Sequence, residues 1–189
     1  MKLKKRVKMK IATCKLRAAS KFMAKGDVRS YLCGIRINSK FIEATNGHIA
    51  VRMDSDVKTK RDVIVRLAGR IPAKSVETEL CFSKDKNTAY HYDGFKQVIG
   101  VQLFEVEDGK FPDLNKVIPE KFTIGKYPLI NAMYQKVFYD AFADKKDDQF
   151  GVKAVSYDTN EKLICNLTGI KNYIYGNPTI VIMAMREDD

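Results

Sequence analysis

The feature that most constrains the fold of this chain is an order of elements that occurs three times. Each time, a helical segment is followed by three strand-like runs, and we interpret the chain as three consecutive strand–helix–three-strand units. Apolar residues recur every three or four positions in the helical segments and alternate in many of the strand-like ones. The pattern predicts helices at 13–25, 71–79 and 127–142, and strands at 31–37, 41–47, 48–54, 62–66, 80–85, 88–94, 98–109, 121–125, 150–158, 162–169 and 178–185.

Two such units make a natural α+β domain, with antiparallel sheets outside and two helices packed together inside. At the first helix, Ala12, Leu16, Ala19 and Met23 form the expected buried stripe. Thr13 is the expected N-cap, and Gly26 follows the expected end. The third unit has no partner unit in its own chain. We therefore expect its helix to be covered by self-association.

Positive charge is concentrated at the N-terminal end. The net charge is +11, but residues 1–40 hold 13 Lys and Arg against one acid (net +12), and the remainder holds 21 basic and 22 acidic residues (net −1). Arg17, Lys21 and Lys25 recur every four residues and line one face of the predicted helix. This placement favours a polyanionic partner, most often nucleic acid. A solubilising arm with a solvated helix face is the alternative.

Several other classes of protein find little support. No apolar run is long enough to span a membrane, and the basic N-terminus lacks the apolar core of a secretory signal. Four widely spaced cysteines favour free thiols in a reducing cytoplasm. Only His48 and His91 are present, which excludes a His-rich metal site, and no catalytic or phosphate-loop motif occurs. We expect no enzymatic activity, no cofactor and no metal.

Two segments mark the expected domain boundaries. Residues 1–10 are predicted to form a basic arm. Residues 109–120 contain two prolines and a Pro-Asp turn signal, which is typical of a linker, and apolar Leu114, Val117 and Ile118 predict that this linker packs against its surroundings. The expected domains are therefore 11–108 and 121–189.

The stretch FIEATNGHIAVRM, at residues 41–53, places Asn46 and Gly47 between two strand-like runs. Asn-Gly is a strong signal for a tight hairpin turn. Either this is an ordinary β-hairpin, or Thr45, Gly47 and His48 also form the edge of a binding site.

Four stretches, taken in order along the chain, resemble segments of the bacterial sliding clamp, the β subunit of the replicative DNA polymerase. They are GDVRSYLCGI (26–35), EATNGHIAV (43–51), DGKFPDLNKVIP (108–119) and IVIMAMRE (180–187). The resemblance covers residues 10–119 and the C-terminal tail well, and 120–179 loosely. It implies a DNA-clamp-like α+β fold, with the family's middle domain at 11–108 and a last domain shortened to about one unit.

The resemblance also implies two binding surfaces. In the family, the turn, the linker and the tail form a hydrophobic groove that takes short peptides of polymerases and clamp loaders, and the helix face holds double-stranded DNA by phosphate contacts. The implied peptide-binding residues are Leu32, Thr45, Gly47, His48, Ile49, Pro112, Lys116, Val117, Val181, Met183, Ala184, Met185 and Arg186. The implied DNA-binding residues are Arg17, Lys21, Lys25, Arg29, Tyr31, Arg66 and Arg70.

The chain departs from the family in ways that affect function. Its first domain is missing, so the usual ring contact between a first and a third domain cannot form as it does there. Ala184 stands where the family has proline. The unusual size suggests a phage or mobile-element origin.

Three hypotheses follow. The first is a clamp-like replication accessory that forms a homo-oligomer, binds DNA without sequence preference and binds partner peptides. The second is a decoy or adaptor that keeps the peptide groove without encircling DNA. The third is a simple basic DNA-binding protein.

Overall fold

The computed structural model describes residues 7–118, 128–144, 148–156 and 162–185. Its strands form one antiparallel sheet in the order β1-β6-β7-β8-β5-β2-β3-β4-β11-β10-β9. The strands are β1 (Val7–Ala12), β2 (Ile35–Ile37), β3 (Phe41–Thr45), β4 (Ile49–Asp54), β5 (Val63–Leu67), β6 (Glu77–Phe82), β7 (Thr88–Tyr92), β8 (Val98–Glu107), β9 (Val152–Ser156), β10 (Lys162–Leu167) and β11 (Thr179–Met183). The helices are α1 (Thr13–Ser20), α2 (Met133–Phe142) and α3 (Gly169–Ile174), with short 3-10 turns η1 (Ser30–Cys33) and η2 (Leu114–Lys116).

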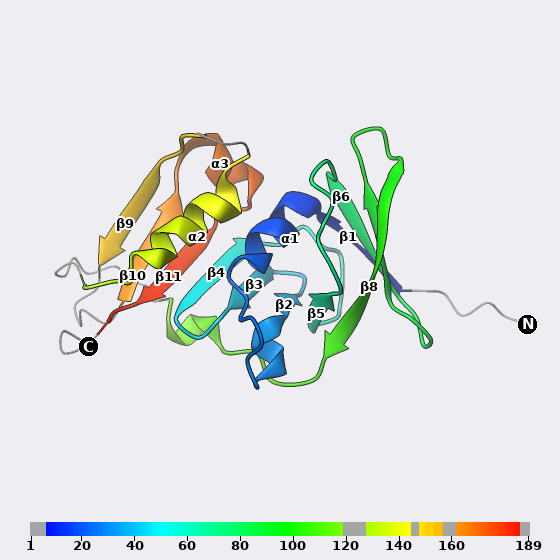
Figure 1. The fold of residues 1–189 in the computed structure, drawn as a ribbon, viewed down its shortest axis with the longest axis horizontal. Helices are drawn as coiled ribbons and strands as arrows, with labels where there is room; N and C mark the ends of the chain where they lie inside the picture. The colour runs from blue at the N-terminus through cyan, green and yellow to red at the C-terminus, as the bar shows by residue number, and fades with distance from the viewer. Residues whose placement is uncertain (1–6, 119–127, 145–147, 157–161, 186–189) are drawn as a thin grey trace, which may run out of the picture.

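The predicted α+β architecture is confirmed. Helices α1 and α2 lie beside each other over one face of the sheet, and the sheet bends at its β1-β6-β7-β8 end (Figure 1). The long strand β8 makes that bend possible, because residues 98–103 pair with β7 while residues 104–107 pair with β5. We call the helix-covered side of the sheet the inner face and the opposite side the outer face.

The predicted helix at 71–79 is wrong. Residues 68–76 form a loop, and Glu77 begins β6, which pairs with both β1 and β7. From Glu77 onward the side chains alternate in direction, because Thr78 and Leu80 are fully buried and Glu79 reaches Lys8 on β1. The second unit therefore has no helix of its own.

Other element boundaries also differ from the expectation. Helix α1 ends at Ser20, so Lys25 lies beyond it. Thr13 is the first helical residue and not the N-cap, since its hydroxyl bonds instead to Ser75 and Thr78. Residues 7–10 of the expected basic arm belong to β1, and α3 was not predicted.

The expectation that the third unit lacks a partner is wrong as well. Its helix α2 packs against α1 and the residues that follow it, with the rings of Phe142 and of Phe22, two residues past the end of α1, centred 6.2 Å apart. Its last strand β11 pairs with β4 of the first unit. One continuous core contains buried side chains from both, including Leu16, Phe138 and Ile180. The first and third units therefore share a core across the expected domain boundary.

The segment from Asp108 to Ile118 crosses the outer face of the sheet. Its Phe111 and Leu114 are buried in a second apolar cluster with Ala50 of β4, Ile164 of β10 and Val181 of β11. The expectation that this linker packs, and does not float, is confirmed. The linker thus connects the two sides of the molecule and also covers the sheet beneath it.

Candidate peptide groove and basic helix face

The β3–β4 turn is shaped by its own side chains. The Thr45 hydroxyl donates to the carbonyl of Ile49 (2.8 Å) and accepts from the amide of Gly47 (3.0 Å). The side-chain oxygen of Asn46 accepts from the amides of His48 and Ile49, both at 2.9 Å. Gly47 has φ of +93°, a conformation that favours glycine. The predicted hairpin turn is confirmed, and it leaves the His48 side chain exposed at its tip.

The C-terminal tail runs directly beside this turn. Strand β11 pairs with β4 so that Ile182 lies opposite Ile49, and the Met183 amide donates to the His48 carbonyl at 2.9 Å. Val181 faces the outer side, and Met183, two residues along the strand, follows it on that side. Met183 and Met185 remain 36% and 38% exposed. Two deformable apolar side chains therefore lie next to the turn with surface available for contact.

The linker approaches the same place from the other side. Val117 and Ile118 pack on the second apolar cluster, which also holds Val181. The linker's first turn depends on Gly109, which has φ of +135° and where a built Cβ would lie 3.0 Å from the Tyr31 ring. Turn, linker and tail thus converge on the outer face, at the junction of β4 and β11.

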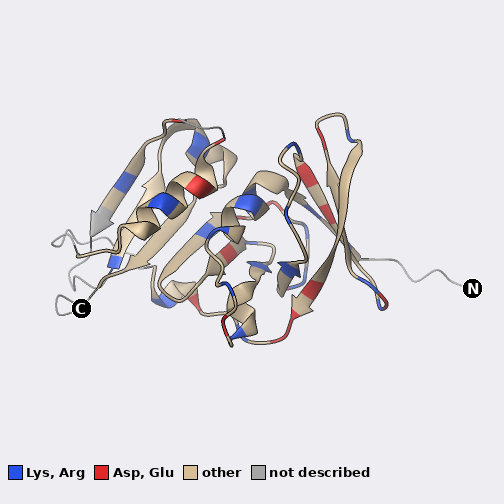
Figure 2. Cartoon of the chain, viewed as in Figure 1, with Lys and Arg blue, Asp and Glu red and all other residues tan. Residues whose placement is uncertain are grey.

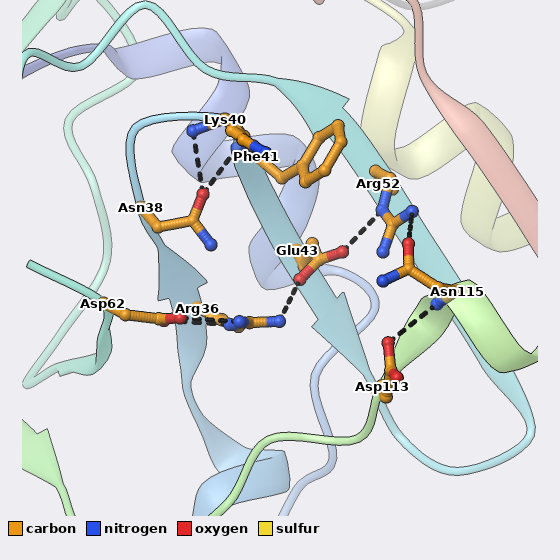
Figure 3. Close-up of polar contacts among 9 residues, drawn as sticks. All are labelled: Arg36, Asn38, Lys40, Phe41, Glu43, Arg52, Asp62, Asp113 and Asn115. Atoms are coloured by element: carbon orange, nitrogen blue, oxygen red, sulfur yellow. Dashed lines mark hydrogen bonds and ion pairs between the residues drawn. The ribbon is translucent and has the colours of Figure 1, made fainter.

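A buried charge network fastens the linker to the sheet (Figure 3). The carboxylate of Glu43, whose side chain is fully buried, accepts from Nη1 of Arg36 (2.9 Å) and Nε of Arg52 (2.6 Å). Arg52 also donates from Nη1 to the side-chain oxygen of Asn115 on η2 (2.8 Å), and Arg36 pairs with Asp62. Sequence reasoning did not identify this network. The available signal was a charged residue inside an otherwise apolar strand, between Ile42 and Ala44, with arginines at positions 36 and 52 on the neighbouring strand-like runs.

The remaining predicted groove residues are spread around this junction. Leu32 is buried in η1, Pro112 and Ala184 are half-buried, and Lys116 is exposed at the end of η2. Arg186 lies outside the described residues.

On the inner face, part of the predicted basic set surrounds one hollow. This hollow has a volume of about 760 Å³ and lies between α1, the 67–73 segment and the C-terminal end of α2. Lys21, Lys25 and Arg70 line it and are exposed. Asp140 and Asp144 line the opposite wall. Figure 2 shows the same contrast, with a basic position on α1 and both signs of charge on α2.

Three of the predicted DNA-binding residues lie elsewhere. Arg29 is beside the β3–β4 turn, where its guanidinium pairs with Asp27 and holds the pKa of that carboxyl at about 2. Tyr31 packs with the outer-face cluster. Arg66 follows Ile64 on the outer face and is paired with Glu105 and Glu107. These three residues are therefore not beside the hollow.

The described part of the chain offers few residues for nucleophilic catalysis or metal binding. The four cysteines form no disulfide with one another in the described ranges, and burial raises the pKa of the Cys165 thiol to about 12, which makes it a poor nucleophile. Among the described residues, no three His, Cys, Asp or Glu side chains are grouped to hold a metal ion. None of the helices in the described ranges is long and apolar enough to cross a membrane.

The sheet with paired helices on one side and a linker on the other defines an α+β protein of the clamp type, and comparison with solved structures agrees. The fold is that of DNA polymerase III subunit beta from Borrelia burgdorferi, with a TM-score of 0.61 at 15% sequence identity over 96% of this chain and 64% of that chain. The beta subunit from Thermotoga maritima gives a TM-score of 0.52 at 11% identity over 95% of this chain and 65% of that chain.

The chain therefore has the sliding-clamp fold and spans just under two thirds of the length of these two proteins. No protein-family model matches it, and no curated protein does.

Proposed function

We propose that this protein is a clamp-like accessory of DNA replication that binds partner peptides on its outer face and DNA phosphates on its inner face. It acts by binding and not by catalysis. The observation that carries the proposal is the convergence of turn, linker and tail, with the Met183 amide hydrogen-bonded to the His48 carbonyl and Val117 packed on the apolar cluster that contains Val181. The sliding-clamp fold supports it.

The groove is the better supported of the two surfaces. Its floor is rigid, because β4 and β11 are paired and the linker is held by Arg52. Its rim offers two partly exposed methionines, which adapt to related peptides, and a histidine able to hydrogen-bond a peptide backbone. We therefore assign peptide binding to Thr45–Ile49, the linker end and Met183–Met185.

The groove is tested with a synthetic peptide that carries the clamp-binding segment of a bacterial DNA polymerase. Replacing Met183 and Met185 together by Ala is expected to weaken binding at least tenfold, because two apolar contacts are lost. Met133→Ala, an exposed methionine on α2, is the matched control and should leave the affinity unchanged. Unchanged affinity in the double variant would remove the groove from the proposal.

The DNA surface is tested by salt dependence. Lys21 and Lys25 are exposed and form no ion pair with any residue in the described ranges, so both are available to phosphates. Changing both to Gln should lower the affinity for duplex DNA and reduce the slope of log K against log salt by about 0.9 per contact. Lys84→Gln with Lys86→Gln, in the β6–β7 loop, is the control. Equal slopes for both pairs would contradict the assignment.

A second candidate, the adaptor that does not encircle DNA, is favoured by two observations. Asp140 and Asp144 face the basic residues across the hollow, which weakens the attraction of the inner face for DNA. The third unit is covered by α1, so its helix supplies no drive for self-association. The mass in solution, measured by light scattering, distinguishes the encircling clamp from the adaptor. A discrete trimer or tetramer supports encirclement, and a monomer with intact peptide binding supports the adaptor.

A further inference from the structure

Arg17 occupies a different environment from the other basic residues at the hollow. Its Nη1 donates to three backbone carbonyls, those of Pro72 (3.0 Å), Ala73 (3.1 Å) and Ser75 (3.0 Å). All three belong to the loop that connects β5 to β6, where a helix was expected. Donors on a cationic group make stronger hydrogen bonds than neutral ones, so these contacts compete with any contact between Arg17 and a phosphate.

The loop is also held by two of its own side chains, because Ile71 packs against the main core and the Ser75 hydroxyl bonds to that of Thr13 at 2.9 Å. At its two ends, the loop is hydrogen-bonded to the sheet. The Ala68 amide donates to the Leu103 carbonyl, and the Val76 amide donates to the Tyr92 carbonyl. Between them, the Ser75 amide donates to the Pro72 carbonyl at 3.1 Å and closes a single turn. A lone turn of this kind leaves carbonyls that need donors, and Arg17 provides them.

We propose that Arg17 is a positioning residue that folds the 70–75 segment and thereby presents Arg70 to the hollow beside Lys21 and Lys25. Arg70 precedes Pro72 by two residues. The turn that Arg17 stabilises therefore determines the position of the Arg70 side chain at the hollow. The DNA part of this inference rests on the proposed function. The structural part does not, because it concerns hydrogen bonds that exist without DNA.

The DNA part is tested by a double-variant cycle on duplex affinity, using the full chain. Arg17→Met keeps the aliphatic stem and removes the donors. Arg70→Gln alone should weaken binding several-fold and lower the salt slope by about 0.9, whereas in the Arg17→Met background it should have no further effect. Lys21→Gln should keep its full effect in both backgrounds, which controls for a general loss of folding.

The outcomes separate the alternatives. Additive losses from Arg17→Met and Arg70→Gln would overturn the proposal, because two independent phosphate contacts add. Loss of the Lys21→Gln effect in the Arg17→Met background would also overturn it, since the damage would then extend beyond the loop. Lys74→Met, a charge removed from the same loop, should weaken binding less than Arg17→Met.

Amide hydrogen exchange tests the structural part even if the wild-type chain fails to bind duplex DNA. In Arg17→Met, the Ser75 amide should exchange about tenfold faster, in line with the loss of charge-assisted bonds. The Val76 amide, bonded into the sheet, should keep its protection. Unchanged exchange at Ser75 would overturn the positioning role, whereas faster exchange with no DNA binding would retain it and reject the DNA surface.

Discussion

The two ends of the sheet are covered in different ways. Over β2, β3, β4, β11 and β10, helices α1 and α2 and the turn after α1 supply an apolar and aromatic cover that includes Phe22, Phe138 and Phe142. Over β6, β7 and β8 a loop takes the place of a helix. There the interior contains a chain of hydrogen bonds among polar side chains, from Ser75 through Thr13 and Thr78 to His91 and Gln102.

The two ends of the sheet satisfy their buried backbone and side-chain polar groups in different ways. A helix satisfies its own backbone and buries side chains, so it needs little from its neighbours. A loop leaves backbone groups that other residues must satisfy, and buried polar side chains must satisfy one another. We therefore expect the helix-covered end to be sensitive to lost volume and the loop-covered end to be sensitive to lost hydrogen bonds.

The largest effect is expected from Phe142→Ala. Phe142 is fully buried and contacts the rings of Phe22 and Tyr175, so truncation should cost about 3–5 kcal/mol of unfolding free energy. Because the first and third units share one core, denaturation should remain a single transition. Phe95→Ala, at a ring that is 87% exposed, is the control. Two separate transitions in the Phe142 variant would show that the third unit folds independently.

The next largest effect is expected at the outer face, from Glu43→Gln. The amide lacks the negative charge and keeps only one acceptor oxygen, so one of the two arginines faces an NH2 donor in place of its acceptor, although Asp62 and Asn115 still bind Arg36 and Arg52. We expect a loss of about 2–3 kcal/mol in urea unfolding, below the cost of a fully uncompensated buried charge. Asp62→Asn, whose carboxylate is 53% exposed, should cost about 0–1 kcal/mol. Equal losses in the two variants would mean that the burial of Glu43 does not increase its contribution to the free energy of unfolding.

Sequence patterns predicted the helix-covered end better than the loop-covered end. Periodicity identified α2 and the strands around it, and Asn46–Gly47 identified the turn, because these signals are local. The segment at 71–79 was misassigned since Pro72 fits the first turn of a helix and the repeated element order called for one here, while the alternation of Thr78, Leu80 and Phe82 begins only at β6.

Which surfaces meet could not be predicted in the same way. An apolar stripe indicates that α2 is buried, but not that α1 is what covers it. The turn and the tail were placed together only through the resemblance to sliding clamps, because residues 45 and 183 are far apart in the sequence. Likewise, a basic side chain such as Arg17 gives no sign in the sequence that backbone carbonyls occupy it.

A smaller effect is expected from Thr78→Val at the loop-covered end. The Thr78 hydroxyl bonds to Thr13 (2.8 Å) and to Nδ1 of His91 (2.9 Å), and valine keeps its shape. The variant should lose about 1–3 kcal/mol, since both partners are left buried without that contact. Thr88→Val, half-exposed on β7, is the control and should be nearly neutral. A neutral result for Thr78 would show that the hydrogen-bond chain does not stabilise this end.

The smallest effect is expected from pH. Burial, and then the nearby Arg17, lower the pKa of His91 below its ordinary value of about 6.5. The unfolded chain therefore binds a proton at a higher pH than the folded chain does, so the stability that His91 contributes is present above about pH 6.5 and is lost as the pH falls towards the folded pKa. Between pH 7.5 and 5.5, the wild type should lose more unfolding free energy than His91→Gln, by at most about 1.4 kcal/mol, because carboxyl groups titrate equally in both. Thr78 and Gln102 hydrogen-bond the ring, and Arg17 is the nearby charge. Equal losses in the two proteins would mean that protonation of His91 does not destabilise the loop-covered end. The two ends would then not differ in their sensitivity to pH.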